Sequence, residues 1–194
     1  MPAPSNVDIR RIALTDTGPV QRLWSDRFGG ASSTQQNWIE AALTPTHSAV
    51  GFVATAPTSG PIVGLSFLDV GDRPYTHQYL GLDTLDCSLR LPDRTGIFHL
   101  SCVRVDWEGY GIGSAFYEQR LAVLRDRGIP RAVGIAWNRP HTVDSRVLFE
   151  KYAFTCLATV ERYYARTGER PHCPDCDGSC TCSASLYARP TGSA

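Results

Sequence analysis

One short segment constrains the fold of this chain more than any other. An apolar run from Ile97 to Val105 leads into three glycines at alternate positions, Gly109, Gly111 and Gly113, and then into an amphipathic stretch that ends at Gly128. The apolar run predicts a buried strand and the stretch after the glycines predicts a helix. Because the first N–H groups of a helix have no partner within it, and glycine lets a ligand approach the backbone closely, this strand–turn–helix unit is suited to hold an anion.

The glycine spacing argues against a dinucleotide-binding unit. That motif is G-x-G-x-x-G early in a repeated strand–helix unit, with an acidic residue about 20 positions further on. Both the spacing and the position differ in this chain. A turn that only packs the helix tightly on the strand is the alternative explanation of the glycines.

Patterns elsewhere predict an α/β protein with the element order βααβββαβαββ. Strands are expected at residues 7–13, 47–54, 62–70, 97–105, 131–137, 154–166 and 183–189, and helices at 20–28, around Trp38, after the glycine turn and at 143–152. An antiparallel hairpin precedes strand–helix–strand crossovers, so we expect a mixed, mostly antiparallel central sheet flanked by helices. The polar stretch 71–95 is expected to be a loop with a short helical turn near 82–91.

Composition narrows the functional classes. Lys plus Arg and Asp plus Glu both number 19, so no net charge draws the chain to nucleic acid or an anionic membrane. No apolar run approaches the roughly 20 residues that span a bilayer, and the N-terminus lacks the apolar stretch of a signal peptide. We therefore expect a cytoplasmic protein with one domain over residues 1–189 and a disordered tail at 190–194.

Cysteines are numerous and unevenly placed. Four crowd into a C-x-x-C and a C-x-C within an insertion at 171–183, before the last strand: Cys173, Cys176, Cys180 and Cys182. Four thiolates suit tetrahedral Zn²⁺, and such a closed site is structural. A disulfide pair, free thiols, and a partner-binding or redox-sensing role are the alternatives. The remaining cysteines, Cys87, Cys102 and Cys156, are expected to be small core residues.

Two motifs together resemble the GNAT family of N-acetyltransferases. The family's acetyl-CoA motif is Gln or Arg, two residues, Gly, one residue, then Gly or Ala, and residues 108–113 have its glycine spacing. Residues 148–154, Leu-Phe-Glu-Lys-Tyr-Ala-Phe, resemble the family's Leu-Tyr-Glu-Lys-Leu-Gly-Phe. The predicted element order is similar too, so the resemblance covers almost the whole chain. It departs at Glu108, where the family has a cation or amide, and at Phe149, where it has tyrosine.

The resemblance implies a GNAT-like acyl-CoA N-acyltransferase fold with acetyl-CoA as acyl donor. The main chain of Val103, Arg104 and Val105, beside Cys102, would pair with the pantetheine arm. The pyrophosphate would lie on the turn formed by Glu108, Gly109, Tyr110, Gly111, Ile112, Gly113 and Ser114. Asn138 and Ser145 are placed at the cofactor as well, although Asn138 could instead be a turn residue before Pro140.

Acyl transfer to an amine needs a general base. His99 lies four residues before Val103, where some family members carry a base, and its ordinary pKa of about 6.5 suits that role. A lone strand histidine is more often structural. The loop residues Asp83, Asp86 and His141 are alternative bases.

The departing thiolate needs a proton, which Phe149 cannot supply. Tyr152, three positions further along the predicted helix, is expected as the general acid. Ser145, four positions back, or solvent could substitute for it.

The predicted activity is transfer of an acetyl or short acyl group from CoA to a primary amine of a small molecule, peptide or protein. A catalytically inactive acyl-CoA-binding or zinc-stabilised interaction module is the alternative. A nucleic-acid-binding zinc protein is disfavoured because the arginines at 162, 166 and 170 alternate with glutamates at 161 and 169. Family members often dimerise through their C-terminal strands and loops, which makes a homodimer one expectation.

Overall fold

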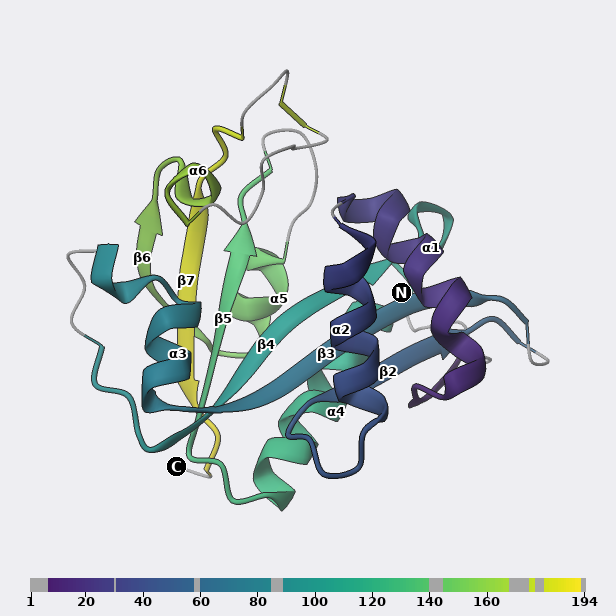
Figure 1. The fold of residues 1–194 in the computed structure, drawn as a ribbon, viewed down its shortest axis with the longest axis horizontal. Helices are drawn as coiled ribbons and strands as arrows, with labels where there is room; N and C mark the ends of the chain where they lie inside the picture. The colour runs from purple at the N-terminus through teal and green to yellow at the C-terminus, as the bar shows by residue number, and fades with distance from the viewer. Residues whose placement is uncertain are drawn as a thin grey trace. The chain divides into compact units, whose positions relative to one another are not determined.

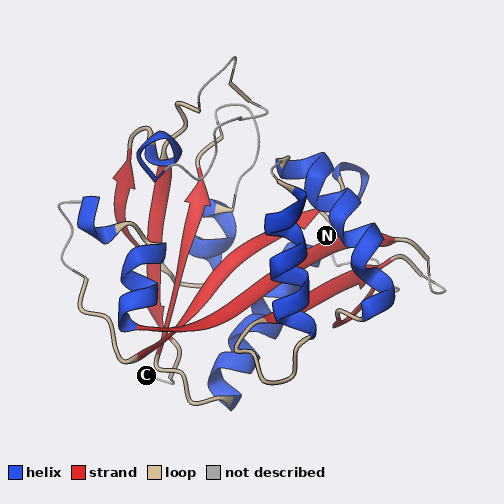
Figure 2. Ribbon diagram, in the orientation of Figure 1, coloured by secondary structure: helices blue, strands red, loops and turns tan. Residues whose placement is uncertain are grey.

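The computed structural model describes residues 7–29, 31–57, 60–84, 89–139, 145–167, 175–176 and 180–192 (Figure 1). Its strands are β1 (Asp8–Arg11), β2 (Val50–Thr55), β3 (Ile62–Asp72), β4 (Arg94–Val103), β5 (Arg131–Trp137), β6 (Thr155–Val160) and β7 (Ala184–Pro190). Its α-helices are α1 (Thr17–Phe28), α2 (Ser32–Leu43), α3 (Arg73–Tyr79), α4 (Ile112–Asp126), α5 (Arg146–Lys151) and α6 (Tyr163–Thr167). Three 3₁₀ turns, η1 (Leu14–Asp16), η2 (Leu82–Thr84) and η3 (Val105–Trp107), complete the described elements (Figure 2).

The strands form a seven-stranded sheet in the order β1-β2-β3-β4-β5-β7-β6. β4 and β5 pair in parallel, whereas β1–β2, β2–β3, β5–β7 and β6–β7 pair antiparallel. The prediction of a mixed, mostly antiparallel sheet is therefore confirmed. The chain gathers into two compact units, one of residues 1–69 and 99–120 and the other of residues 70–98 and 121–194.

The first unit is built on the predicted β2–β3 hairpin. Successive residues of β3 point to opposite faces. Leu65 and Phe67 join a core formed with α1 and α2, whereas a Cβ added at Gly64 would lie 3.0 Å from Phe116 of α4. Figure 1 shows α1 and α2 side by side across β2 and β3. Because β3 is covered on both faces, its sequence is an almost unbroken apolar run.

The second unit is centred on aromatic packing against β5 and β7. The Phe149 ring of α5 stacks on Tyr187 with centroids 4.7 Å apart and an interplanar angle of 5°. Phe154 meets the Phe149 ring edge-on at 5.0 Å, and the Phe98 ring lies 5.3 Å from the Phe154 ring at an angle of 60°. Gly134 makes room for this contact, since a Cβ at that position would lie 2.5 Å from Cζ of Phe149.

The predictions for residues 71–95 and 154–166 are wrong in part, because each segment contains a helix that was not predicted. The supposed loop at 71–95 contains α3, whose N-terminus is capped by Asp72 through a 2.8 Å hydrogen bond from the Tyr75 amide to Oδ1. The strand expected over 154–166 ends at Val160, and α6 follows after Arg162 adopts φ 54°. The order βααβββαβαββ therefore lacks α3 and α6.

Smaller differences concern element ends and cysteines. β2 begins at Val50, and β4 ends at Val103 instead of Val105. The disordered tail expected from residue 190 is wrong at its start, because Pro190 belongs to β7 and Thr191 is buried; residues 193–194 lie outside the described residues. Of the cysteines expected in the core, Cys102 is buried and Cys156 is exposed, so the prediction is wrong for Cys156; Cys87 lies outside the described residues.

No helix within the described ranges combines the length and apolar character needed to cross a bilayer.

The contact between Gly134 and Phe149 can be tested by substitution. We expect Gly134→Ala to lower the free energy of unfolding by about 1–3 kcal/mol, because the added methyl group overlaps the Phe149 ring. Gly192→Ala is the matched control, since no described atom apart from Gly192 itself and its chain neighbours lies within 4 Å of a Cβ at that position. Urea denaturation of both variants checks this, and equal stability would show that α5 does not pack on β5 as described.

Candidate functional site

The predicted glycine turn is present and lies wholly within the first unit. After η3, Glu108 is extended, and both Gly109 and Gly111 have a φ of 81°, a conformation that favours glycine. α4 then begins at Ile112, and the Ala115 amide donates to the Gly111 carbonyl at 3.0 Å. The turn thus presents the N-terminus of a 15-residue helix, where the helix dipole favours an anion.

The segment that leads into the turn is held to the sheet. The Arg104 amide donates to the Val63 carbonyl of β3 at 2.8 Å. Its guanidinium donates two hydrogen bonds to Asp106, from Nε to Oδ1 at 3.0 Å and from Nη2 to Oδ2 at 2.5 Å. The hydrogen bond from Arg104 lowers the pKa of Asp106, so this carboxylate is ionised at neutral pH.

Glu108, the departure from the family motif, forms an ion pair across the unit. Its Oε1 lies 2.5 Å from Nη2 of Arg27, which is in the last turn of α1. The Arg27 side chain is 24% exposed and the Glu108 side chain 49%. Because Arg27 offsets the charge of Glu108, the turn does not present an uncompensated carboxylate to an anion. No local sequence pattern predicts the role of Arg27, which is 81 positions away from its partner.

His99, the predicted base, lies on β4 in the same unit as the turn. Its half-buried ring stacks on Trp38 of α2, with centroids 3.6 Å apart and an interplanar angle of 12°. The Trp24 ring lies 6.2 Å away at 54°. These contacts hold the imidazole plane in one orientation.

Cys102 follows on the same strand and is buried. Burial raises the pKa of its thiol to about 12, an effect that the nearby Arg27 charge opposes. Cys102 is therefore a neutral thiol at physiological pH and is not suited to act as a thiolate nucleophile.

The other predicted site residues belong to the second unit. The Asn138 side chain donates to Ser183 Oγ at 3.1 Å and to Ser185 Oγ at 3.0 Å. Ser145 precedes α5, and its carbonyl accepts the amides of the next turn. Tyr152 ends that helix, with Lys151 Nζ 5.5 Å from the centre of its ring.

Phe149, which stands where the resembled motif has tyrosine, is buried. Phe149 is 2% exposed and its ring packs on Tyr187. This position is therefore part of the core and is not open to a substrate. Among the alternative bases, Asp83 is exposed, 3.5 Å from His77, whereas Asp86 and His141 lie outside the described residues.

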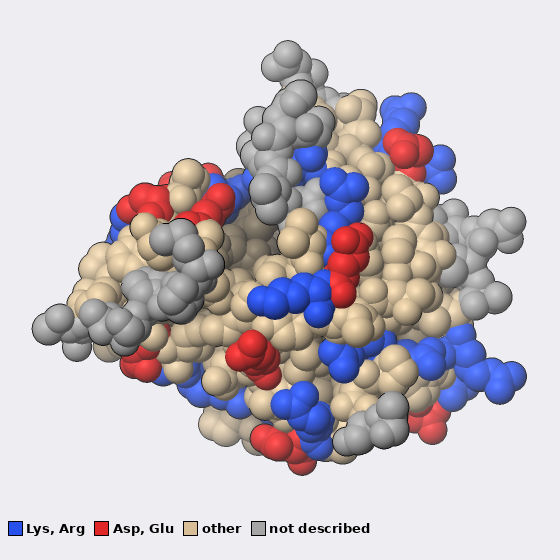
Figure 3. Space-filling view, turned by 180° about the vertical axis from the view of Figure 1, so that it is seen from behind, with Lys and Arg blue, Asp and Glu red and all other residues tan. Residues whose placement is uncertain are grey.

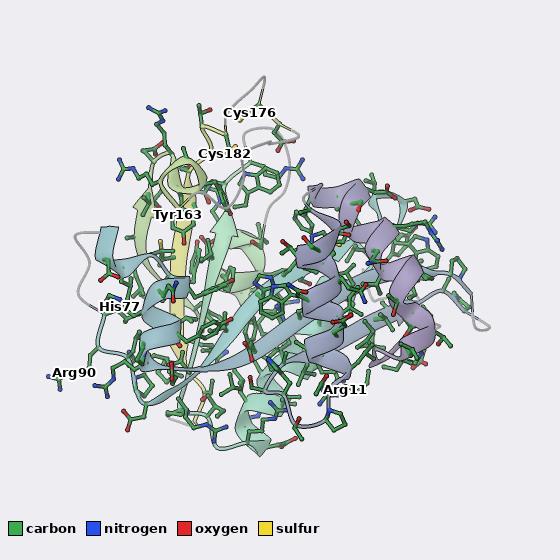
Figure 4. The ribbon with its side chains drawn as sticks, in the orientation of Figure 1. Arg11, His77, Arg90, Tyr163, Cys176 and Cys182 are labelled. Carbon is green, nitrogen blue, oxygen red and sulfur yellow. The ribbon has the colours of Figure 1, made fainter. Side chains whose placement is uncertain are left out.

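Three of the four predicted metal ligands converge in the second unit. The ligand atoms of Cys176, Cys180 and Cys182 all lie within 4.8 Å of one another, and Figure 4 shows two of these thiols close together in the segment before β7. Cys173 lies outside the described residues. The 3.6 Å between Sγ of Cys176 and Sγ of Cys182 is close to the ~3.8 Å edge of a tetrahedron with Zn–S bonds of about 2.3 Å.

The same segment is anchored to the end of β5. Arg139 forms two hydrogen bonds to Asp175, Nε to Oδ2 at 2.5 Å and Nη2 to Oδ1 at 2.6 Å. Its guanidinium also lies 4.5 Å from the centre of the Trp137 ring. Asp175, which directly precedes Cys176, is therefore held beside the end of β5.

On the face shown in Figure 3, Lys and Arg side chains lie beside Asp and Glu side chains instead of gathering by sign.

No family model matches the sequence, and no curated protein matches it. Solved structures match along nearly their whole length. The ribosomal-protein-S18-alanine N-acetyltransferase of Escherichia coli is 16% identical, with a TM-score of 0.63 and 97% and 96% of the two chains covered. Arabidopsis thaliana NAA60 in complex with acetyl-CoA is 12% identical, with a TM-score of 0.67 and 95% and 99% covered.

A GNAT-family acetyltransferase from Streptococcus pneumoniae is 14% identical, with a TM-score of 0.65 and 96% and 99% covered. At these identities the likeness establishes the fold. The expected GNAT-like fold is confirmed.

Proposed function

We propose that this chain is an acyl-CoA-dependent N-acetyltransferase that moves an acetyl or other short acyl group from CoA to a primary amine of a small molecule, peptide or protein. The observation that carries the proposal is the turn at 108–114, where two glycines of positive φ lead into α4. The similar fold of NAA60, solved with acetyl-CoA, supports the choice of donor. We treat residues 1–189 as one acyltransferase domain.

The residues of the turn fit the proposed donor. The main chain of Val103, Arg104 and Val105, beside Cys102, would pair with the pantetheine arm, and the backbone N–H groups of residues 108–114 would hold the pyrophosphate. Among the described residues, no atom apart from Gly109 itself and its chain neighbours lies within 4 Å of a Cβ at Gly109, so the turn is open at this position. Acetyl-CoA supplies the activated thioester, and Asn138 and Ser145 are the proposed contacts in the second unit.

In the proposed reaction, the amine nitrogen forms a bond to the thioester carbonyl carbon as the carbon–sulfur bond breaks. His99 accepts the proton that the nitrogen loses, and Tyr152 donates a proton to the departing sulfur. For His99, the supporting observation is a ring held by stacking on Trp38, four residues before the proposed pantetheine-binding segment. Ser145 or solvent is the alternative proton donor.

We also propose structural zinc at Cys173, Cys176, Cys180 and Cys182. The convergence of the three described thiols supports it. The ion pair between Arg139 and Asp175 would then hold the metal-bound segment against β5.

Acetyl-CoA binding tests the turn. We expect calorimetric titration to show micromolar affinity, and Gly111→Asp to weaken it at least tenfold by adding both a carboxylate and backbone strain. Gly128→Asp is the matched control, because Gly128 also has a positive φ, 62°, but follows α4 at its far end. Equal affinity in the two variants would place the donor elsewhere.

Turnover tests His99. We expect His99→Gln to lower kcat with a panel of amines by about 10²–10⁴-fold, the usual contribution of general base catalysis, and to change acetyl-CoA affinity little. Thioester consumption measured by thiol release checks this. Unaltered kcat would remove His99 as the base, and acetyl-CoA binding without turnover in the parent protein would favour the inactive binding module.

Metal content tests the cysteine cluster. We expect about one zinc per chain by elemental mass spectrometry and a clear loss of zinc in Cys176→Ser, because a thiolate ligand is removed. Cys156→Ser is the control, since Cys156 is exposed and lies outside the cluster. Zinc-free protein of unchanged thermal stability would contradict the proposal.

A further inference from the structure

The glycine turn carries two arginine–carboxylate pairs, and they are bound differently. Arg104 holds Asp106 through both Nε and Nη2, two residues away on the same segment. Arg27 reaches Glu108 from α1 through Nη2 alone, at 2.5 Å. A guanidinium has five N–H donors in a fixed fork. The Arg27 contact with Glu108 therefore leaves geometric capacity for a second anion, whereas Arg104 already uses its bidentate edge.

The position of Arg27 suits that second anion. Glu108 directly precedes Gly109, and the helix that follows the glycines points its positive end at the same turn. The Arg27 charge also reaches the end of β4, where it acts on the buried Cys102 thiol. The Arg27 side chain is three-quarters covered, at 24% exposure, so its charge is less screened than that of a fully exposed arginine.

We propose that Arg27 binds the pyrophosphate of the acyl-CoA at the glycine turn, and that Glu108 is a positioning residue that holds its guanidinium there. This inference rests on the proposed acyl-CoA binding. Stability alone is a weak reason for the pair, since a partly exposed ion pair contributes little to the free energy of unfolding. Arginine binds phosphate oxygens bidentately, and hydrogen bonds to charged groups are worth roughly twice as much as neutral ones.

The test compares acetyl-CoA with a ligand that has the same thioester and pantetheine arm but ends before the pyrophosphate. NMR titration gives the Kd of acetyl-CoA and of S-acetylpantetheine, which lacks both the pyrophosphate and the nucleotide. We expect Arg27→Gln to raise the Kd of acetyl-CoA about tenfold, from loss of a charge-assisted contact, and to leave the Kd of S-acetylpantetheine unchanged. Arg22→Gln is the matched control: Arg22 is an exposed arginine of the same helix, and its loss is expected to change neither Kd.

Exchanging the charges of Arg27 and Glu108 tests whether the pair places a cation at the turn. Arg27→Glu alone should weaken acetyl-CoA binding more than tenfold, and the double variant Arg27→Glu with Glu108→Arg should recover to within about threefold of the parent, because the cation returns to the turn. Circular dichroism verifies that each variant is folded.

The outcomes separate this inference from the proposed function. If the parent binds acetyl-CoA but Arg27→Gln raises the Kd of both ligands equally, or of neither, Arg27 has no pyrophosphate contact and the inference is wrong. If the parent itself does not bind acetyl-CoA, the proposed function fails and the inference fails with it.

Discussion

The left-handed backbone at Gly109 and Gly111 lets the chain turn into α4 after β4 and η3, and the proposed chemistry depends on that turn. A side chain at either position would strain the backbone, so glycine fixes both the geometry and the exposure of the turn. On one side, the Arg104 amide binds β3; on the other, Phe116 of α4 packs against the bare backbone of Gly64. The sheet thereby supports the turn from both ends.

Charge around the turn is balanced by pairs formed within the first unit. Glu108 would repel a phosphate if it stood alone, but Arg27 offsets its charge from a helix far away in the sequence. Asp106 is offset in the same way by Arg104. The segment around the turn therefore contains two carboxylates, each paired with an arginine, without presenting a net negative charge. For this reason Glu108 is compatible with the proposed binding of acyl-CoA at the turn.

Sequence patterns predicted the elements that depend mainly on interactions between residues close in the sequence. The glycine turn, the β2–β3 hairpin and β5 all have sequence signals that match their structures. α3 was missed because its helix is short and polar and depends on a cap from Asp72. Arg27 and the burial of Phe149 were missed because both depend on tertiary contacts, with Glu108 and with Tyr187, that no spacing rule encodes. Cys156 failed for a related reason: its apolar neighbours predicted a core position, but it faces solvent on the edge strand β6.

The most direct test of this account is a map of backbone amide NMR shifts as acetyl-CoA is added to the intact chain. The account predicts that the largest shifts fall on the amides of residues 108–114, because those donors meet the pyrophosphate, and that S-acetylpantetheine leaves them nearly unmoved. Shifts that cluster elsewhere, or none at saturating acetyl-CoA, would contradict the claim that this turn is the cofactor site.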